Sequence, residues 1–334
     1  MNKNYAIFIA VTPNFKKYLN ALLNSIEKQG LYKDCSLTVY VLHHEMDNGS
    51  YLKAITESFS YTVIPIEVKR EDVDHPADTK RIEFIKRARF KYVLEYGENY
   101  DVICLLDADM FFVSPDFMQL FDLINGTDKL IGCNEKFKWE IGSNYIYEEK
   151  PIFTPPQKLY RMHCSVPIIF NLNHWKDVFE YYLKIAFYGK QFKKDKWVGI
   201  GDIMSWNISV YKCNKQDNII VFPMEVMCQV HQTYIHPDKY INVENGYWFT
   251  QAGDRIYSIQ GRWNSNLDFI EDKMGWCKEH YFDNIGRNDY DKLAPKIQRG
   301  LECIQQEWYS LNYCSTLILD EDKEKHEIFN RGVS

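Results

Sequence analysis

The sequence predicts an α/β protein whose mostly parallel β-sheet is flanked by helices, and two observations support this fold class. Along the first hundred residues, continuously apolar runs alternate with segments of helical spacing. Strands that are apolar on both faces are typical of a parallel sheet covered by helices on both sides. The second observation is the length of 334 residues, since α/β folds of this size often form one unit.

The elements of the first half follow in chain order. The continuously apolar run YAIFIAV predicts a first strand over residues 5–11. Leucines at helical spacing predict a helix over 18–30 that ends at Gly30. The same criteria predict the next elements in turn: strand 36–44, helix 51–60, strand 61–68, helix 79–97 and strand 101–109.

The second half is less regular, and no internal repeat, low-complexity linker or clear domain boundary interrupts it. Residues 134–160 are rich in Tyr, Pro and Glu and predict a long loop. The other expected elements are these: strand 129–137, strand 164–172, helix 175–189, a loop leading into a helix over 196–212, strands at 218–226 and 254–264, and helix 297–311 before a charged tail.

Composition excludes several classes of protein. A net charge of −6 and a pI of about 5.9 predict no basic surface for nucleic acid. The nine cysteines form no CxxC pair, so we expect reduced thiols and a cytoplasmic location. The N-terminal apolar run resembles a strand rather than a signal peptide, and no run reaches the roughly 18 residues of a transmembrane anchor.

The stretch YDVICLLDADMFF carries the strongest chemical signal. Asp107 and Asp109 end an apolar strand, and their spacing puts both side chains on one face of extended chain. Two carboxylates within an apolar segment are costly unless a cation compensates them, and Mg²⁺ or Mn²⁺ prefers such oxygen ligands. The alternative is an acidic turn that simply ends the strand.

The helix before this strand carries basic residues. Arg89 shares one face with apolar residues, so it needs a partner, either a nucleotide phosphate or the carboxylates of Asp107 and Asp109. The alternative is an arginine whose head reaches solvent at the helix edge. Three other basic residues of the helix are expected to be solvated, namely Arg81, Lys86 and Arg87.

LLDADMFFVSPDFMQLF resembles the DxD strand of glycosyltransferases with the GT-A fold, in particular those of family 8. In that family an arginine precedes the first aspartate by about seventeen residues, and Arg89 precedes Asp107 by eighteen. The resemblance covers about residues 5–265 and implies a Rossmann-like mixed sheet of GT-A type over residues 1–265. Residues 266–334 are then a helical extension packed on the same domain.

The resemblance also implies the activity. The chain is expected to be a hexosyltransferase of the EC 2.4 type that uses Mn²⁺ or Mg²⁺. It transfers a sugar from a nucleotide diphosphate sugar, a UDP-sugar above all, to a hydroxyl of a glycan, protein or lipid-linked acceptor. Family 8 implies retention, in which the leaving phosphate takes the acceptor proton. An inverting enzyme instead needs a carboxylate base.

Matched positions imply site residues. The segment AVTPNF corresponds to the part of the family that contacts the nucleotide, through Ala10, Val11, Thr12 and Asn14, although Pro13 replaces the usual aspartate. Ala108 joins the two aspartates in binding the donor. In GDIMSWN, Asp202 matches an aspartate that contacts the transferred sugar or the acceptor, and the alternative is a helix N-cap.

The resemblance offers several candidates for the third metal ligand. The family supplies a histidine and a lysine in a segment that corresponds here to IYSIQGRWN. Gln260 or Ser258 stands in place of the histidine, Arg262 in place of the lysine, and His231 or His236 is a further alternative. The aromatic residues expected to stack on sugars are Tyr247, Trp248 and Trp263.

Two other functions remain open from the sequence. A sugar-phosphate nucleotidyltransferase also uses metal-binding aspartates, but it usually has a glycine-rich loop after the first strand, and TPNFKKY has no glycine. A catalytically impaired sugar-nucleotide-binding protein with the same fold is the second alternative, because several family positions differ here.

Overall fold

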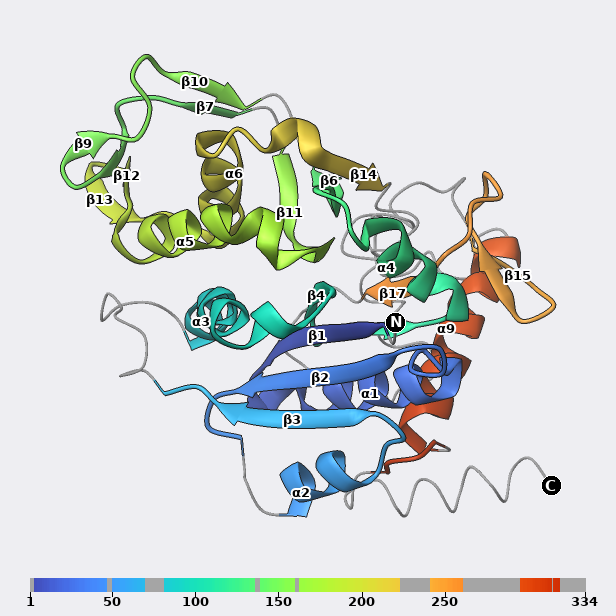
Figure 1. Cartoon of the computed structure of the whole chain (residues 1–334). Helices are drawn as coiled ribbons and strands as arrows, with labels where there is room; N and C mark the ends of the chain where they lie inside the picture. The colour runs from blue at the N-terminus through green and yellow to red at the C-terminus, as the bar shows by residue number, and fades with distance from the viewer. Residues whose placement is uncertain are drawn as a thin grey trace, which may run out of the picture.

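The computed structural model describes residues 3–46, 50–69, 81–135, 139–159, 162–222, 241–260, 295–313 and 315–318. Its centre is a seven-stranded sheet in the order β14-β6-β11-β4-β1-β2-β3 (Figure 1). The strands are β1 (Asn4–Val11), β2 (Ser36–His43), β3 (Thr62–Glu67), β4 (Val102–Asp107), β6 (Leu130–Glu135), β11 (Met162–Phe170) and β14 (Ile219–Phe222).

The sheet is mixed and mostly parallel. β4, β1, β2 and β3 run parallel to one another, as do β14 and β6, whereas β11 is antiparallel to both β4 and β6. β11 therefore joins two parallel groups. The predicted fold class, an α/β protein with a mostly parallel sheet flanked by helices, is confirmed.

Helices cover both faces of this sheet. They are α1 (Lys16–Gln29), α2 (Ser50–Glu57), α3 (Arg81–Tyr96), α4 (Met118–Ile124), α5 (Leu172–Tyr188) and α6 (Asp202–Lys212), while α9 (Pro295–Tyr313) packs on α1. Alternate residues of β1 enter two separate cores, as the period of two in a strand requires. Ile7 and Ile9 pack with α1, α2 and α4, while Ala6 and Phe8 pack with α3, α5 and α6.

The end of α1 shows why the first helix stops where the sequence predicts. Gly30 has a left-handed backbone, with φ of 63°, and its N–H bonds to the carbonyl of Glu27. Glycine adopts this conformation without the steric cost that a side chain imposes, so it is the usual residue after a helix end.

The prediction of a long loop over residues 134–160 is wrong. The described part of this segment contains β7 (Trp139–Ile141), β8 (Tyr145–Tyr147), β9 (Lys150–Pro151) and β10 (Gln157–Leu159). β13 (Lys196–Gly199) replaces the start of the loop expected before α6, and it forms a second sheet with β12 (Lys190–Lys193), β8 and β9. Ile141, Tyr145 and Leu159 pack against Ile185 of α5 and Ile208 of α6.

Short elements complete the described chain. β5 (Met110–Phe112) pairs with β17 (Ser258–Gln260), and β15 (Asn242–Glu244) pairs with β16 (Tyr247–Phe249). Single 3₁₀ turns lie at η1 (Pro13–Phe15), η3 (Gly97–Asn99), η4 (Pro115–Phe117) and η5 (Gln216–Asn218). The predicted strand at 218–226 is described as β14 (Ile219–Phe222) after the η5 turn, and that at 254–264 as β17, with residues 254–257 described outside any strand. The remaining residues of the two predictions, 223–226 and 261–264, lie outside the described residues.

α9 packs against α1, although the two are distant in sequence. The Trp308 ring lies 4.9 Å from that of Tyr18, and the Asn24 amide donates to the carbonyls of Leu311 and Leu317 at 2.7 and 2.8 Å. The division at residue 265 stays a prediction, because residues 261–294 lie outside the described ranges. No helix in the described ranges has the length and apolar character needed to cross a bilayer.

Gly189 sits where α5 meets the chain before α6, and replacing it with alanine is expected to destabilise the fold. A Cβ there would lie 2.5 Å from the Ile185 carbonyl oxygen and 2.9 Å from Ile200 Cδ1. We expect Gly189→Ala to lower the free energy of unfolding by about 1–3 kcal/mol in urea titrations. Gly199→Ala is the matched control, because its Cβ meets no described atom within 4 Å. Equal stability of the two variants would contradict this packing.

Candidate active site

The two aspartates lie at the carboxyl edge of the parallel strands. Asp107 is the last residue of β4, and Asp109 directly precedes β5. Asp107 is aligned with Ala10 of β1 in the sheet register. Ligands of open α/β sheets bind at this edge. The predicted residues from both strands therefore meet at one place.

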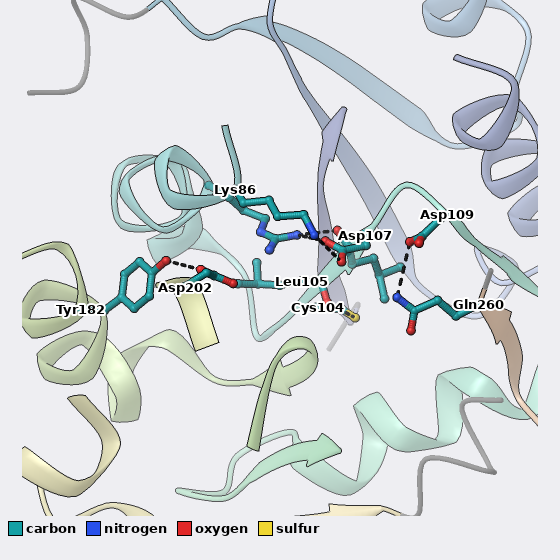
Figure 2. Close-up of polar contacts among 10 residues, drawn as sticks. Lys86, Cys104, Leu105, Asp107, Asp109, Tyr182, Asp202 and Gln260 are labelled. Atoms are coloured by element: carbon teal, nitrogen blue, oxygen red, sulfur yellow. Dashed lines mark hydrogen bonds and ion pairs between the residues drawn. The ribbon is translucent and has the colours of Figure 1, made fainter. Parts of the chain in front are cut away.

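Asp107 is held by two cations from α3. Lys86 Nζ donates to Oδ2 at 3.0 Å, and Arg89 Nη1 donates to Oδ1 at 3.1 Å and to the Leu106 carbonyl at 2.7 Å (Figure 2). The Arg89 side chain is 0% exposed. Arg89 therefore has a DxD carboxylate as its partner, and the alternative of an arginine reaching solvent at the helix edge is wrong.

The prediction that Lys86 and Arg87 are solvated is also wrong. Arg87 is 2% exposed and donates to the carbonyls of Ala186 at 2.6 Å and Ile200 at 3.0 Å. The Lys86 side chain is 31% exposed and ends on Asp107. The physical reason is that α3 is enclosed by the sheet and by α5 and α6, so its basic side chains bond buried acceptors. The side chain of Arg81 lies outside the described set.

These contacts set the charge of the cluster. Burial alone raises the pKa of Asp107, but the charges of Lys86 and Arg89 and their hydrogen bonds outweigh burial and hold this pKa below its ordinary value. Burial alone lowers the pKa of Lys86, yet Asp107 and Asp109 raise it above its ordinary value. Asp107 is therefore an anion and Lys86 a cation at neutral pH.

The lowered pKa of Asp107 gives the stability of the protein a defined pH dependence. A carboxyl whose pKa is lower in the folded state stabilises the fold above its unfolded pKa, and this contribution is lost as the pH falls through the folded pKa. We expect the stability gap between wild type and Asp107→Asn to be largest above about pH 5 and to narrow as the pH falls below the ordinary value of 3.8. Urea midpoints measured from pH 7 to pH 2.5 test this, and a gap that is constant with pH would contradict it.

Asp109 contacts Gln260 across the β5–β17 pair. Gln260 aligns with Met110, and its Nε2 donates to Asp109 Oδ1 at 3.4 Å. Asp109 is only 6% exposed. The other candidate on this strand, Ser258, is fully buried and aligns with Phe112, two positions further along. Of the proposed third ligands, His231 and His236 lie outside the described residues, as does Arg262.

The donor set around Asp109 fits a hard cation. Gln260 Oε1 is buried and has no hydrogen-bond donor among the described residues. A buried acceptor without a partner costs free energy. In the present orientation Nε2 faces Asp109, and exchanging the two ends of the amide would bring Oε1 to face the carboxylate, as a shared cation requires. Carboxylate and amide oxygens are the ligands that Mg²⁺ and Mn²⁺ prefer. Within the described residues no group of three His, Cys, Asp or Glu residues comes together, so the amide is the nearest described complement to the two carboxylates.

Asp202 lies in a second contact, between α5 and α6. It is the first residue of α6, and the buried Tyr182 hydroxyl of α5 donates to its Oδ1 (Figure 2). Gly201 occupies the N-cap position, so the alternative of Asp202 as the N-cap is wrong. Burial raises the pKa of Tyr182, and Asp202 raises it further. The Tyr182 ring stacks on Phe90 of α3 at 3.8 Å, next to Arg89.

The predicted nucleotide-contact residues lie in the last two positions of β1 and in the turn directly after it. Ala10, Val11 and Thr12 are buried, and Asn14 in the η1 turn is exposed. Their position at the carboxyl edge agrees with the predicted place, and their role stays a prediction. Ala108, between the two aspartates, is 2% exposed.

The aromatic residues expected to stack on sugars differ in exposure. Trp248 is 6% exposed and belongs to the interior. Tyr247 is 43% exposed, and the Arg255 guanidinium lies over one face of its ring at 3.7 Å. Trp263 lies outside the described residues. The sequence did not predict that Lys86 bonds Asp107 or that Tyr182 bonds Asp202. Each residue lies within a helix, and the neighbouring residues in the sequence do not indicate its partner.

Comparisons with known proteins support the fold. No protein-family model and no curated protein sequence matches the chain. A structure of the galactosyltransferase LgtC in complex with donor and acceptor sugar analogues is similar, with a TM-score of 0.53 and 15% identity over 96% of this chain and 99% of that one. The likeness confirms the GT-A type of fold.

Weaker similarities extend over part of the chain. The bifunctional glycosyltransferase WbbM has a TM-score of 0.47 and 14% identity, over 70% of this chain and 41% of its own. The glycosyltransferase GlyE of Streptococcus pneumoniae TIGR4 has a TM-score of 0.43 and 13% identity, over 70% of this chain and 48% of its own. The chain thus spans less than half the length of these two proteins.

Proposed function

We propose that the chain is a metal-dependent glycosyltransferase of family 8 type, which moves a sugar from a UDP-sugar to a hydroxyl of a glycan, protein or lipid-linked acceptor. The observation that carries the proposal is the pair Asp107 and Asp109 at the carboxyl edge of the sheet, with Lys86 and Gln260 beside them. The fold shared with LgtC, a galactosyltransferase, supports the same activity.

In this proposal the donor diphosphate lies against the DxD segment. Asp107, Asp109 and Gln260 would hold Mn²⁺ or Mg²⁺, and the ion would supply Lewis-acid stabilisation of negative charge on the diphosphate. Lys86 is the partly exposed cation of the cluster and binds phosphate oxygen directly. Arg89 is buried beneath Asp107 and acts as a positioning residue. Arg262 adds a further positive charge.

The two ends of the donor have separate partners. Ala10, Val11, Thr12 and Asn14 lie at the end of β1 and contact the base and ribose. Asp202 contacts the transferred sugar or the acceptor, and the hydroxyl of Tyr182 fixes the orientation of its carboxylate. We propose retention, in which the leaving diphosphate takes the proton of the acceptor hydroxyl. An inverting reaction would require Asp202 to take that proton.

Hydrolysis of the donor tests the proposal without knowledge of the acceptor. Purified protein is incubated with a panel of UDP-sugars in Mn²⁺, in Mg²⁺ and in EDTA, and UDP and free sugar are quantified. A parallel set contains added pyrophosphate and is assayed for UTP and sugar 1-phosphate. We expect release of UDP from one donor above all, dependent on the metal. Formation of UTP and sugar 1-phosphate from donor and pyrophosphate would indicate a nucleotidyltransferase, and no turnover with any donor would overturn the enzymatic proposal.

A second candidate, a sugar-nucleotide-binding protein without catalysis, is favoured by one observation. Lys86 and Arg89 already compensate the charge of Asp107, and no third carboxylate or histidine stands beside the pair in the described part of the chain. UDP binding without hydrolysis or transfer would support this candidate. For the location we propose the cytoplasm, supported by Cys35, Cys104 and Cys213, which form no disulfide with a described residue.

A further inference from the structure

A cavity of about 710 Å³ lies beside the small sheet, away from the DxD segment in sequence. The β8–β9 turn, the last turn of α5 and strand β13 line it, in the upper left of Figure 1. Its volume falls in the range of about 300–1,000 Å³ that is typical of small-molecule sites. Nothing in the proposed donor site uses it.

The wall of the cavity carries exposed aromatic rings. Tyr188 at the end of α5 is 51% exposed, and Trp197 in β13 is 46% exposed. The Trp197 ring packs against Phe192 on the neighbouring strand at 5.3 Å, so its orientation is supported. Large rings held at the surface beside a cavity offer contact area to a ligand, and their flat faces suit one with an apolar face and a polar edge.

Charged groups complete the same wall. Glu148 and Glu149 form the β8–β9 turn, and Lys190 lies in β12. Both glutamates have positive φ, 50° and 60°, a conformation that costs free energy for residues other than glycine. Two carboxylates and an ammonium group accept and donate hydrogen bonds to hydroxyls. An apolar peptide or a lipid surface would instead remove water from these charged groups without supplying hydrogen bonds in its place.

The cavity is tied to Asp202 by short stretches of chain. Gly199 lines the cavity and precedes Asp202 by three residues, and the lining residue Phe187 follows Tyr182 within α5. Arg87 of α3 donates to the carbonyls of Ala186 and Ile200, which are the chain neighbours of those lining residues. The cavity wall and the Asp202 carboxylate are thus fixed to the helix that carries Lys86 and Arg89.

We propose that this cavity is a saccharide subsite, which binds sugar units of the acceptor beyond the unit that receives the transferred sugar. We call it the aromatic platform, made of Tyr147, Glu148, Glu149, Tyr188, Lys190 and Trp197. The apolar faces of sugar rings stack on Trp197 and Tyr188, and their hydroxyls bond to the glutamates and the lysine. The assignment of the bound saccharide as an acceptor rests on the proposed function.

Binding to a glycan array in the absence of donor and metal tests the platform directly. The full chain is applied to an array of several hundred oligosaccharides, and the strongest ligand is titrated in solution by saturation-transfer NMR. We expect a saccharide of two or more units to bind, with Trp197→Ala weakening it by about tenfold or more, as for a central aromatic contact. Trp139→Ala is the matched control, because Trp139 is 44% exposed and lies outside the cavity lining.

The outcomes separate the two proposals. Thermal melting first establishes that Trp197→Ala folds as the wild type does. The saccharide site is overturned if no glycan binds, or if wild type and Trp197→Ala bind glycan equally well. It is also overturned if sedimentation shows a dimer that Trp197→Ala abolishes, because the platform is then a contact between two copies of the chain. Glycan binding without hydrolysis of any UDP-sugar keeps the saccharide site and overturns the proposed transferase. Hydrolysis of a UDP-sugar without glycan binding keeps the proposed transferase and overturns the saccharide site.

Discussion

Replacing Asp109 with asparagine is expected to reduce metal-dependent hydrolysis of the UDP-sugar on the order of 10²–10³-fold. The substitution keeps the shape of the side chain and an oxygen that accepts from Gln260, which lies at 3.4 Å in the wild type. In the proposed site it removes a negative charge that would hold the cation. Initial rates at saturating donor, measured across Mn²⁺ concentrations, are expected to show both a lower kcat and a weaker dependence on the metal.

The control for this variant is Asp34→Asn. Asp34 is exposed and precedes β2, at the amino end of the sheet, so its loss is not expected to change the rate. If the two variants have near-identical melting temperatures, a difference between their rates comes from the site and not from a loss of folding. An Asp109→Asn enzyme with wild-type turnover would rule out a catalytic role for the DxD segment.

Arg89→Met is expected to produce the largest loss of stability, about 3 kcal/mol or more. The substitution leaves Asp107 in a buried position with Lys86 as its remaining cation, and it removes the donor to the Leu106 carbonyl. Removing one partner of a buried ion pair leaves the other charge buried without compensation. The loss of stability is therefore larger than for an exposed pair. Urea unfolding at neutral pH provides the measurement.

A surface ion pair and a double variant serve as controls. Arg255 pairs with Asp116, and both side chains are partly exposed, so Arg255→Met is expected to cost at most about 1 kcal/mol. The double variant Arg89→Met, Asp107→Asn is expected to lose less stability than the sum of the losses of the two single variants. The reason is that it no longer contains the uncompensated buried charge of Asp107. Strict additivity, or equal losses for Arg89 and Arg255, would refute the coupling.

The core of the fold and the position of the acidic pair follow from the sequence. β1, β2 and β4 are continuously apolar, so they predict buried parallel strands, and Asp107 then falls at a strand end. Arg89 on an apolar helix face predicts a buried partner, which is the Asp107 carboxylate. The contact of Gln260 with Asp109 was predicted only through the order of family motifs.

The small sheet was missed because its turns lack the usual residues. Two-residue hairpin turns of this type favour Asn-Gly, whereas here Glu148-Glu149 and Lys194-Asp195 adopt positive φ. The contacts of Lys86, Arg87 and Tyr182 depend on how α3, α5 and α6 pack around one another. Tertiary packing decides which residue of another helix becomes the partner of a side chain. The periodicity of the side chain's own helix does not predict that partner.

The central claim is that Asp107 and Asp109 bind a nucleotide diphosphate through a divalent cation. Isothermal titration of UDP into the wild-type protein, in Mn²⁺ and then in EDTA, tests it most directly. We expect Mn²⁺ to tighten UDP binding by at least about tenfold, or about 1.4 kcal/mol, and Asp109→Asn to abolish this gain. UDP binding of equal strength with and without the metal, or no UDP binding at all, would contradict the claim.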